Sequence, residues 1–192
     1  PGRRTSAIRI GSVTNGVHVP SWAGRTSWEF WERHNSHEWK EHLTDPKFWQ
    51  HVSDPSVVSD EELWALRYAL RRELIEFVRS RARQQRAFGG ASGEEAVYRL
   101  LSFDALTIGY ARRFAPYKRA PLIFSDLSRA LTLFNDLQRP VQIIYAGKAH
   151  PRDGEGKDFL RRIVEVTREH PFFGKVIFLE NYDMNVARRL VS

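Results

Sequence analysis

The sequence predicts an α/β fold in which a parallel sheet with crossover helices follows a helical, aromatic-rich subdomain. Three observations support this prediction. From residue 104 onward, short apolar runs alternate with amphipathic segments. Residues 60–86 carry apolar side chains at helical spacing, and residues 29–58 are rich in Phe and Trp without a clear period. Repeated alternation of strand and helix indicates right-handed crossovers and therefore parallel strands.

Composition limits the classes of protein to consider. The 192 residues are 42% hydrophobic and 28% charged, which suits a globular chain with one good core. The absence of cysteine excludes disulfides and thiol chemistry. No apolar run reaches the roughly 18 residues of a membrane span, and no signal segment opens the chain. We therefore expect a cytoplasmic protein without a membrane partner.

Residues 1–28 contain one β-like run, from Ala7 to Val13, and then a predicted tight turn at Asn15-Gly16. Asn and Gly both tolerate the positive φ angles that such turns require. In residues 29–58 we expect short helices and turns that pack through their aromatic rings. Three histidines occur here: His34, His37 and His42. Their spacing is not a standard ligand pattern, so we expect no metal site.

Residues 60–86 give the clearest helix. Ser59 and Glu62 form a capping box at its start. The expected apolar stripe consists of Leu63, Leu66, Leu70, Leu74 and Phe77. Arginines cover the remaining surface, which raises the possibility of nucleic-acid binding. Glu73 and Glu76 alternate with them, and this favours a solvated, salt-bridged face and no nucleic-acid partner.

A Gly-rich connector at residues 89–93 leads to a second capping box, Ser92 with Glu95, and to a short helix that ends near Leu101. The expected strands are Ala105–Tyr110, Val141–Ala146 and Lys175–Leu179. The expected helices are Ala120–Asn135, with Leu122, Leu127, Leu131 and Phe134 inward, then Lys157–Glu169, and a last one from Asn185. Near-continuous apolar strands indicate a sheet that is covered on both faces.

In an open parallel sheet, ligands bind beyond the carboxyl ends of the strands. The first strand ends in a segment with four cations, Ala111–Arg119, and the second ends in Gly147-Lys148. The next helix, expected to start near Lys118, would add its N-terminal amides. We therefore predict an anion site, most simply for phosphate. The alternative is that these cations pair with carboxylates such as Asp104 or Glu180. The turn after the first strand lacks the G-x-G-x-x-G pattern, which disfavours the usual dinucleotide-binding fold. Gly147-Lys148 lacks the glycine spacing and the following Ser or Thr of a P-loop.

Four ordered segments resemble the α-glucan phosphorylases, closest to their shorter bacterial and archaeal branch. They are Val13–Trp22, Gly109–Arg119, Gly147–Pro151 and Phe178–Met184. The likeness spans nearly the whole chain. It implies a partial Rossmann-like domain of the GT-B type, with residues 1–28 as interdomain crossover, 29–103 as helical subdomain and 104–192 as the first half of the C-terminal domain. On this interpretation the chain is an internal fragment.

The resemblance implies a glycosyltransferase that cleaves α-1,4-glucan ends with phosphate and releases glucose 1-phosphate. Carried over by position, Arg113 and Lys118 would be catalytic and bind the substrate phosphate, and Asn15 would hydrogen-bond the glucosyl unit. Pyridoxal phosphate would be the cofactor, and its phosphate group would relay a proton. The cofactor would be lined by Arg112, Lys118, Tyr182 and Trp22.

The resemblance leaves several points open. Asp183 stands where better-known members carry Arg, and the role of Lys148 is not assigned. The Glu-Ala-Ser-Gly-Thr segment that precedes the family's cofactor lysine does not occur in these 192 residues. We therefore expect the cofactor to attach outside this chain, and the piece alone to be inactive. A nucleotide-sugar glycosyltransferase of the same architecture is the alternative, followed by a basic nucleic-acid-binding module. A homo-oligomeric parent is compatible with either enzyme.

Overall fold

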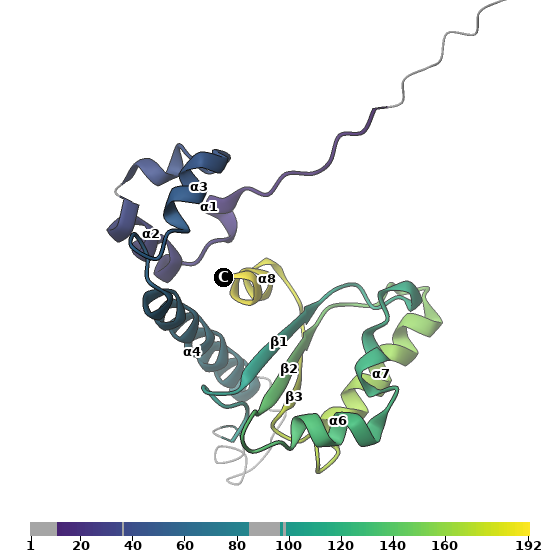
Figure 1. Ribbon diagram of the computed structural model, residues 1–192. Helices are drawn as coiled ribbons and strands as arrows, with labels where there is room; N and C mark the ends of the chain where they lie inside the picture. Colours follow the sequence, from purple (N-terminus) through teal and green to yellow (C-terminus); the bar gives the residue numbers. More distant parts are fainter. Residues whose placement is uncertain (1–10, 36, 85–96, 98) are drawn as a thin grey trace, which may run out of the picture.

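The computed structural model describes residues 11–35, 37–84, 97 and 99–192 (Figure 1). Most of the expected β-like run from Ala7, the Gly-rich connector and the second capping box lie outside these residues. Residues 11–18 form no regular element, so the described end of that run is not a strand.

The N-terminal part is helical and packs through aromatic rings, as the sequence predicted. Its elements are α1 (Val19–Trp22), α2 (Arg25–Asn35), the 3-10 helix η1 (His37–Lys40) and α3 (Pro46–Val52). Phe30, Val52 and Val58 are buried in one cluster with Trp31 and Trp49 against them. The rings of Trp31 and Trp49 meet edge to face at 5.5 Å, an arrangement that aromatic pairs prefer.

No group of three or more His, Asp or Glu side chains in the described ranges is placed to hold a metal ion. His34 instead bonds the Phe30 carbonyl and Glu62, and His42 stacks on Phe48 at 5.1 Å. Among the same residues, no helix combines the length and the apolar character that crossing a membrane requires.

Helix α4 (Asp60–Gln84) begins at the predicted capping box. The Ser59 backbone N–H donates to the Glu62 carboxylate at 3.0 Å, and the Glu62 N–H donates to the Ser59 hydroxyl at 3.3 Å. The predicted apolar stripe is only partly correct, because Leu63 is 37% exposed and the deepest contacts come from Ile75 and Val78.

The stripe is only partly correct because α4 packs against the aromatic cluster with its first half and against the sheet with its second half. Leu66, in its first half, contacts the aromatic cluster around Phe30. Ile75, Val78 and Ala82, in its second half, pack under the sheet. The buried face therefore rotates along the helix, and a single stripe cannot describe it.

The predicted parallel sheet is confirmed. Its strands are β1 (Leu106–Ala111), β2 (Val141–Ala146) and β3 (Val176–Leu179), in the order β1-β2-β3. The register pairs Tyr110 with Tyr145, and Ala146 with both Ala111 and Leu179. Consecutive strands lie side by side, as short right-handed crossovers require.

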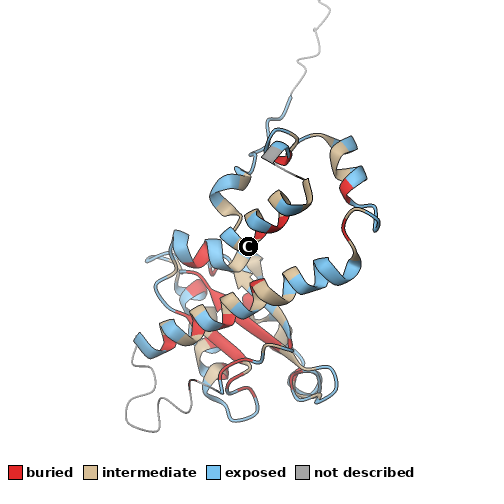
Figure 2. Ribbon diagram, turned by 90° about the vertical axis from the view of Figure 1, so that its left-hand side faces the viewer, coloured by how far each residue is buried: buried red, intermediate tan, exposed pale blue. Residues whose placement is uncertain are grey.

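Helices cover both faces of the sheet. Helices α6 (Leu127–Phe134) and α7 (Gly154–Arg168) lie on one face, and α4 and α8 (Met184–Val191) lie on the other (Figure 1). Each face has its own buried cluster, one around Ile144 and Val186, the other around Tyr145 and Ile163. The buried strands β2 and β3 thus run between helices whose outer sides are exposed, whereas no residue of the edge strand β1 is buried (Figure 2).

The expected single helix over Ala120–Asn135 is wrong. The chain forms two 3-10 helices, η2 (Pro116–Lys118) and η3 (Ala120–Phe124), and only then α6. Asp126 starts α6 by accepting a hydrogen bond from the Arg129 N–H at 2.9 Å, the usual role of an N-cap aspartate. Of the residues expected inward, Leu122 is 60% exposed and Leu127 is exposed as well, whereas Phe124 takes the buried place.

Candidate functional site

The segments that follow β1 and β2 stay hydrogen-bonded to each other beyond the ends of the two strands. The Arg112 N–H donates to the Ala146 carbonyl at 3.3 Å, and the Phe114 N–H donates to the Lys148 carbonyl at 3.1 Å. Arg113 lies between these two bonds. The arginines that follow β1 and the lysine that follows β2 therefore run side by side at the carboxyl edge of the sheet.

Two glycines allow this backbone to pack closely. Gly147 has a φ of +147°, and a Cβ there would lie 2.0 Å from the Arg112 carbonyl oxygen. A Cβ on Gly156, in the first turn of α7, would lie 2.4 Å from the Phe114 carbonyl oxygen. Real Cβ atoms do not approach this closely, so only glycine fits at either position. The backbone is thus tightly packed at the carboxyl edge of the sheet.

Phe114 anchors the start of the loop that follows β1. Its side chain is fully buried. Its ring lies 5.8 Å from that of Tyr110 and 5.9 Å from that of Phe178. A buried ring of this size holds the neighbouring backbone in place, so Arg112 and Arg113 emerge from a fixed point.

The expected helix N-terminus near Lys118 is absent. The described chain there forms the η2 turn, followed by Arg119 in the left-handed region at φ +53°. The first α-helix after β1 begins at Leu127, and Asp126 caps it. Lys118 therefore does not start an α-helix, and the formal positive charges of this loop are those of its side chains.

The three expected phosphate ligands of the loop lie near solvent. Arg112 and Arg113 are exposed, and Lys118 is partly exposed. The Lys118 ammonium lies 4.7 Å from the centre of the Tyr117 ring, a cation–π contact of modest strength. All three positive charges can therefore be reached by a ligand.

Within the described ranges, none of these three cations forms an ion pair. The acidic side chains that could have paired with them, Asp104 and Glu180, make no salt bridge to them. Uncompensated guanidinium and ammonium groups gathered on one loop attract and hold anions. The residues present therefore fit phosphate groups, both that of a substrate and that of a phosphate-bearing cofactor.

The end of β3 contributes a carboxylate, not a cation. Asp183 caps α8 by accepting from the Val186 N–H at 2.9 Å, and its carboxylate lies 3.7 Å from Arg81. The Val186 hydrogen bond, followed by the charges of Arg81 and Lys148, lowers the pKa of Asp183. Asp183 thus occupies the N-terminus of α8, and one nearby positive charge is that of Lys148.

The structure groups some of the expected site residues and separates others. Tyr182 packs against the buried cluster on the α4 and α8 face. The Lys118 carbonyl is bonded to Tyr110, which belongs to the cluster on the α6 and α7 face. The two residues therefore approach the sheet edge from opposite faces. Convergence of their side chains with Arg113 stays a prediction.

Trp22 and Asn15 lie elsewhere. Trp22 ends α1, close to Gly24, where an added Cβ would lie 3.1 Å from the Ser192 hydroxyl oxygen. Helix α1 therefore neighbours the C-terminal end of α8, whereas Tyr182 precedes the N-terminal end. Asn15 is exposed on the segment that extends from α1 away from the sheet (Figure 1). The expected roles of Asn15 and Trp22 stay predictions.

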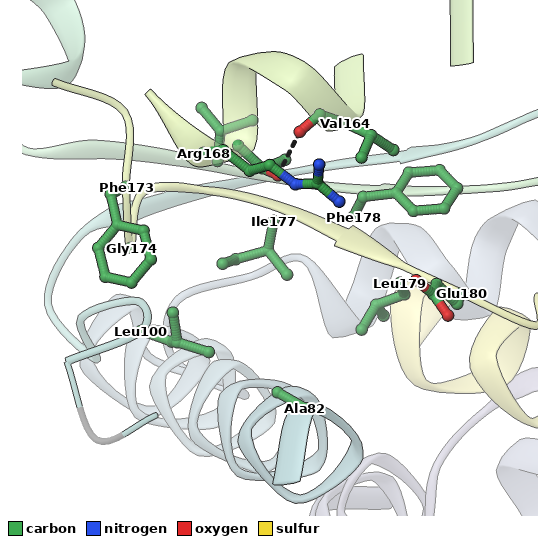
Figure 3. A pocket seen from close by; sticks show the side chains of 12 residues that line it. Ala82, Leu100, Val164, Arg168, Phe173, Gly174, Ile177, Phe178, Leu179 and Glu180 are labelled. Atoms are coloured by element: carbon green, nitrogen blue, oxygen red, sulfur yellow. Dashed lines mark hydrogen bonds between the residues drawn. The ribbon is translucent and has the colours of Figure 1, made fainter. Parts of the chain in front are cut away.

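A cavity of about 230 Å³ runs along β3, between the end of α4 and helix α7 (Figure 3). Ala82 and Leu100 line one wall and Val164 and Arg168 the other. None of the residues expected to contact phosphate or cofactor lines it. Arg168 and Glu180 place one charge of each sign on its walls, so it carries no excess of positive charge, and the edge that carries Arg112, Arg113 and Lys118 is the better candidate anion site.

Two tyrosines that no sequence motif marks lie beneath this edge. The Tyr145 hydroxyl donates to the Ala120 carbonyl at 3.0 Å, and the Tyr110 hydroxyl donates to the Lys118 carbonyl at 3.3 Å. A phenol inside an apolar strand is itself a signal, because a buried hydroxyl needs a partner. The identity of that partner depends on the fold and could not be deduced from spacing.

Comparisons with known proteins give the family. The chain is 38% identical over 185 residues to maltodextrin phosphorylase of Thermococcus litoralis, and this alignment covers 96% of the chain. It is 38% identical over 186 residues to glycogen phosphorylase of Aquifex aeolicus, and 39% over 185 residues to that of Mycobacterium tuberculosis, each covering 95% of it. This chain is homologous to a segment of the glycogen and maltodextrin phosphorylases. No family model matches it.

The phosphorylase homology confirms the resemblance seen in the four sequence segments. It extends over almost every residue of the chain, but the chain spans only 22%, 26% and 21% of the lengths of these three relatives. The relatives are phosphorylases by name. The helical subdomain and the cationic edge thus belong to a phosphorylase-type polypeptide.

Proposed function

We propose that this segment forms part of the phosphate cradle of an α-glucan phosphorylase, within a longer chain that we call the full-length protein. The observation that carries the proposal is a set of three cations, Arg112, Arg113 and Lys118, which lie on one loop at the carboxyl edge of the sheet and form no ion pair with any residue that the structure describes. The reaction would transfer a terminal glucosyl unit of an α-1,4-glucan to phosphate and release glucose 1-phosphate.

In this proposal Arg113 and Lys118 hold the substrate phosphate. Arg grips a phosphate through two parallel hydrogen bonds, whereas Lys acts as a point charge. Asn15 orients the glucosyl unit by a hydrogen bond. These groups bring the phosphate and the glucan together and so supply positioning, which can account for much of the acceleration of a two-substrate reaction.

Arg112, Lys118, Tyr182 and Trp22 would line the cofactor, pyridoxal phosphate. When bound, that group would supply a phosphate that exchanges a proton with the substrate phosphate. The attachment lysine would lie elsewhere in the full-length protein, because the segment that precedes it in the family does not occur in these 192 residues. Residues of this chain would then bind the phosphate end and not the aldehyde end.

The electrostatic task of the loop is to hold two phosphate groups close together. Two unit charges 4 Å apart interact by about 4 kcal/mol at the effective dielectric constant of a partly buried site. Repulsion of this size, multiplied by the charges of two phosphates, opposes simultaneous binding. Cations beside both groups offset it, and they do so most where charge shifts in the transition state.

The test compares Lys118→Ala and Arg113→Ala with the parent in the full-length protein. We expect turnover, measured as glucose 1-phosphate release, to fall on the order of a hundredfold or more. Glucan binding should change little, since the lost contacts are to phosphate. Arg139→Ala is the matched control, because this exposed arginine lies away from the loop and pairs with its neighbour Asp136. Near-normal turnover of the Lys118→Ala protein would remove the basis for the phosphate assignment.

A further inference from the structure

Two tyrosine hydroxyls bond the backbone of the loop that carries Arg112, Arg113 and Lys118, which we call the cationic loop. Tyr110 on β1 and Tyr145 on β2 are direct partners in the strand register, and their rings lie 5.1 Å apart. The Tyr145 hydroxyl donates to the Ala120 carbonyl at 3.0 Å, and the Tyr110 hydroxyl donates to the Lys118 carbonyl at 3.3 Å. The two bonds therefore bracket one residue, Arg119.

Arg119 is the residue of this loop that needs such support. Its φ of +53° places it in the left-handed region, which costs a non-glycine residue roughly 1–2 kcal/mol. Such a conformation persists only where its surroundings over-determine it. The Arg119 N–H also donates to the Pro116 carbonyl at 3.1 Å, and its carbonyl accepts from the Leu122 N–H at 3.0 Å. With the tyrosines, the loop is fixed on both sides of the turn.

Both tyrosines can act as hydrogen-bond donors over the whole working range of pH. Burial is the main cause that raises the pKa of Tyr145 and that of Tyr110. Tyr145 is almost fully buried, whereas Tyr110 is only partly so. Their hydroxyls therefore stay protonated, and the carbonyls of Ala120 and Lys118 keep their donors.

We propose that Tyr110 and Tyr145 are positioning residues for the phosphate cradle, which act by fixing the backbone direction at Lys118. The proposal rests on the proposed function. Lys118 carries its charge at the end of a long, flexible stem, so a small rotation of its backbone moves the ammonium far. Functional groups must be held within about 0.5 Å of their working geometry, and a displacement of about 1 Å can cost a hundredfold in rate.

The experiment replaces each hydroxyl in the full-length protein by Tyr145→Phe and Tyr110→Phe, alone and together. We expect each single change to raise the KM for phosphate about tenfold or to lower kcat by a similar factor. The KM for glucan should stay within about twofold of the parent value. The double change should not exceed the loss caused by Lys118→Ala, because the tyrosines act through that residue.

Ile163→Val is the matched control for loss of packing. Ile163 is fully buried in the same cluster as Tyr145 and contributes no hydrogen bond to the loop. The control should lower the melting temperature and leave both KM values unchanged. If the tyrosine variants behave like this control, the hydroxyls serve stability alone and the inference is wrong.

The Lys118→Ala protein separates this inference from the proposed function. A crippled Lys118→Ala protein together with unchanged phosphate KM in both tyrosine variants would overturn the inference and leave the proposed function standing. Near-normal turnover of Lys118→Ala would instead overturn the phosphate cradle, and the inference with it. If Tyr145→Phe fails to fold, Tyr110→Phe decides, since Tyr110 is only partly buried.

Discussion

His34 joins the aromatic subdomain to the start of α4. Its Nδ1 lies 2.9 Å from the Phe30 carbonyl oxygen, and its Nε2 lies 3.1 Å from the Glu62 carboxylate. Both partners accept hydrogen bonds, so the ring satisfies both only when each of its nitrogens carries a hydrogen. The same Glu62 completes the capping box with Ser59. One carboxylate thus ties a helix start to a neighbouring helix.

This arrangement predicts a pH dependence of stability. The hydrogen bond from His34, followed by those from the Ser59 backbone and hydroxyl, lowers the pKa of Glu62 from 4.5 to about 2. A carboxyl whose pKa is lower in the folded state stabilises the fold above its unfolded value, and this contribution is lost as pH falls toward the folded value. Glu62→Gln should therefore flatten the loss of stability between about pH 4.5 and 2. Chemical denaturation across this range measures it.

Glu61→Gln is the control for that measurement, because it removes a charge from the same first turn of α4. It should leave the slope of stability against pH close to that of the parent chain. Equal slopes for the parent chain and for Glu62→Gln would contradict a lowered pKa of Glu62 in the folded state.

Local patterns placed several residues at the edge of the sheet where the structure has them, whereas their roles stay predictions, and the limits of such patterns are physical. Arg112 and Lys148 were placed at the carboxyl edge because parallel strands end on one side of a sheet. The partners of Tyr110 and Tyr145 could not be predicted, since each hydroxyl bonds a carbonyl outside its own strand. Spacing along the chain does not encode such contacts.

Among the elements, the sequence predicted the strands within one residue at each end, because apolar runs bounded by polar ones are short and distinct. The start of α4 was also correct, since Ser59 and Glu62 meet within one turn. The segment from Ala120 to Asn135 was not, because apolar residues three apart share a face in a short 3-10 helix as well as in an α-helix. Asp126 is the signal that sequence reasoning overlooked.

Helix α4 gives a prediction at this scale. Ile75 is fully buried beneath the sheet, whereas Leu63 is 37% exposed near the start of the helix. Ile75→Ala should lower the free energy of unfolding by about 2 to 5 kcal/mol through lost burial and a residual cavity. Leu63→Ala should cost about 1 kcal/mol or less, as surface changes usually do. Urea denaturation of the two variants measures the difference. Equal costs would mean that the original apolar stripe, and not the observed face, describes the packing.

At the scale of the whole molecule, the sheet has an open edge at β1. Among the strands that the structure describes, β1 pairs with β2 alone, and Leu106 is 61% exposed and Ile108 36% exposed. Helices α6 and α7 lie on one face and α8 on the other. Because crossovers are right-handed, a strand that followed α8 would pair with β1 and not with β3. Within the described sheet, the apolar side chains of β1 thus lie at an edge to which a further strand could be added.

An exposed apolar edge strand is a template for pairing with another chain. We therefore expect the 192-residue chain to self-associate through β1 as its concentration rises. Leu106→Lys should weaken this association about tenfold or more, because a charge on the strand must be desolvated when two edges meet. Leu137→Lys is the matched control, since Leu137 is 93% exposed in the loop before β2 and belongs to no strand. Sedimentation velocity over a range of concentrations measures both variants. Equal weakening by the two lysines would point to net charge as the cause, and no change with Leu106→Lys would show that β1 is not the contact surface.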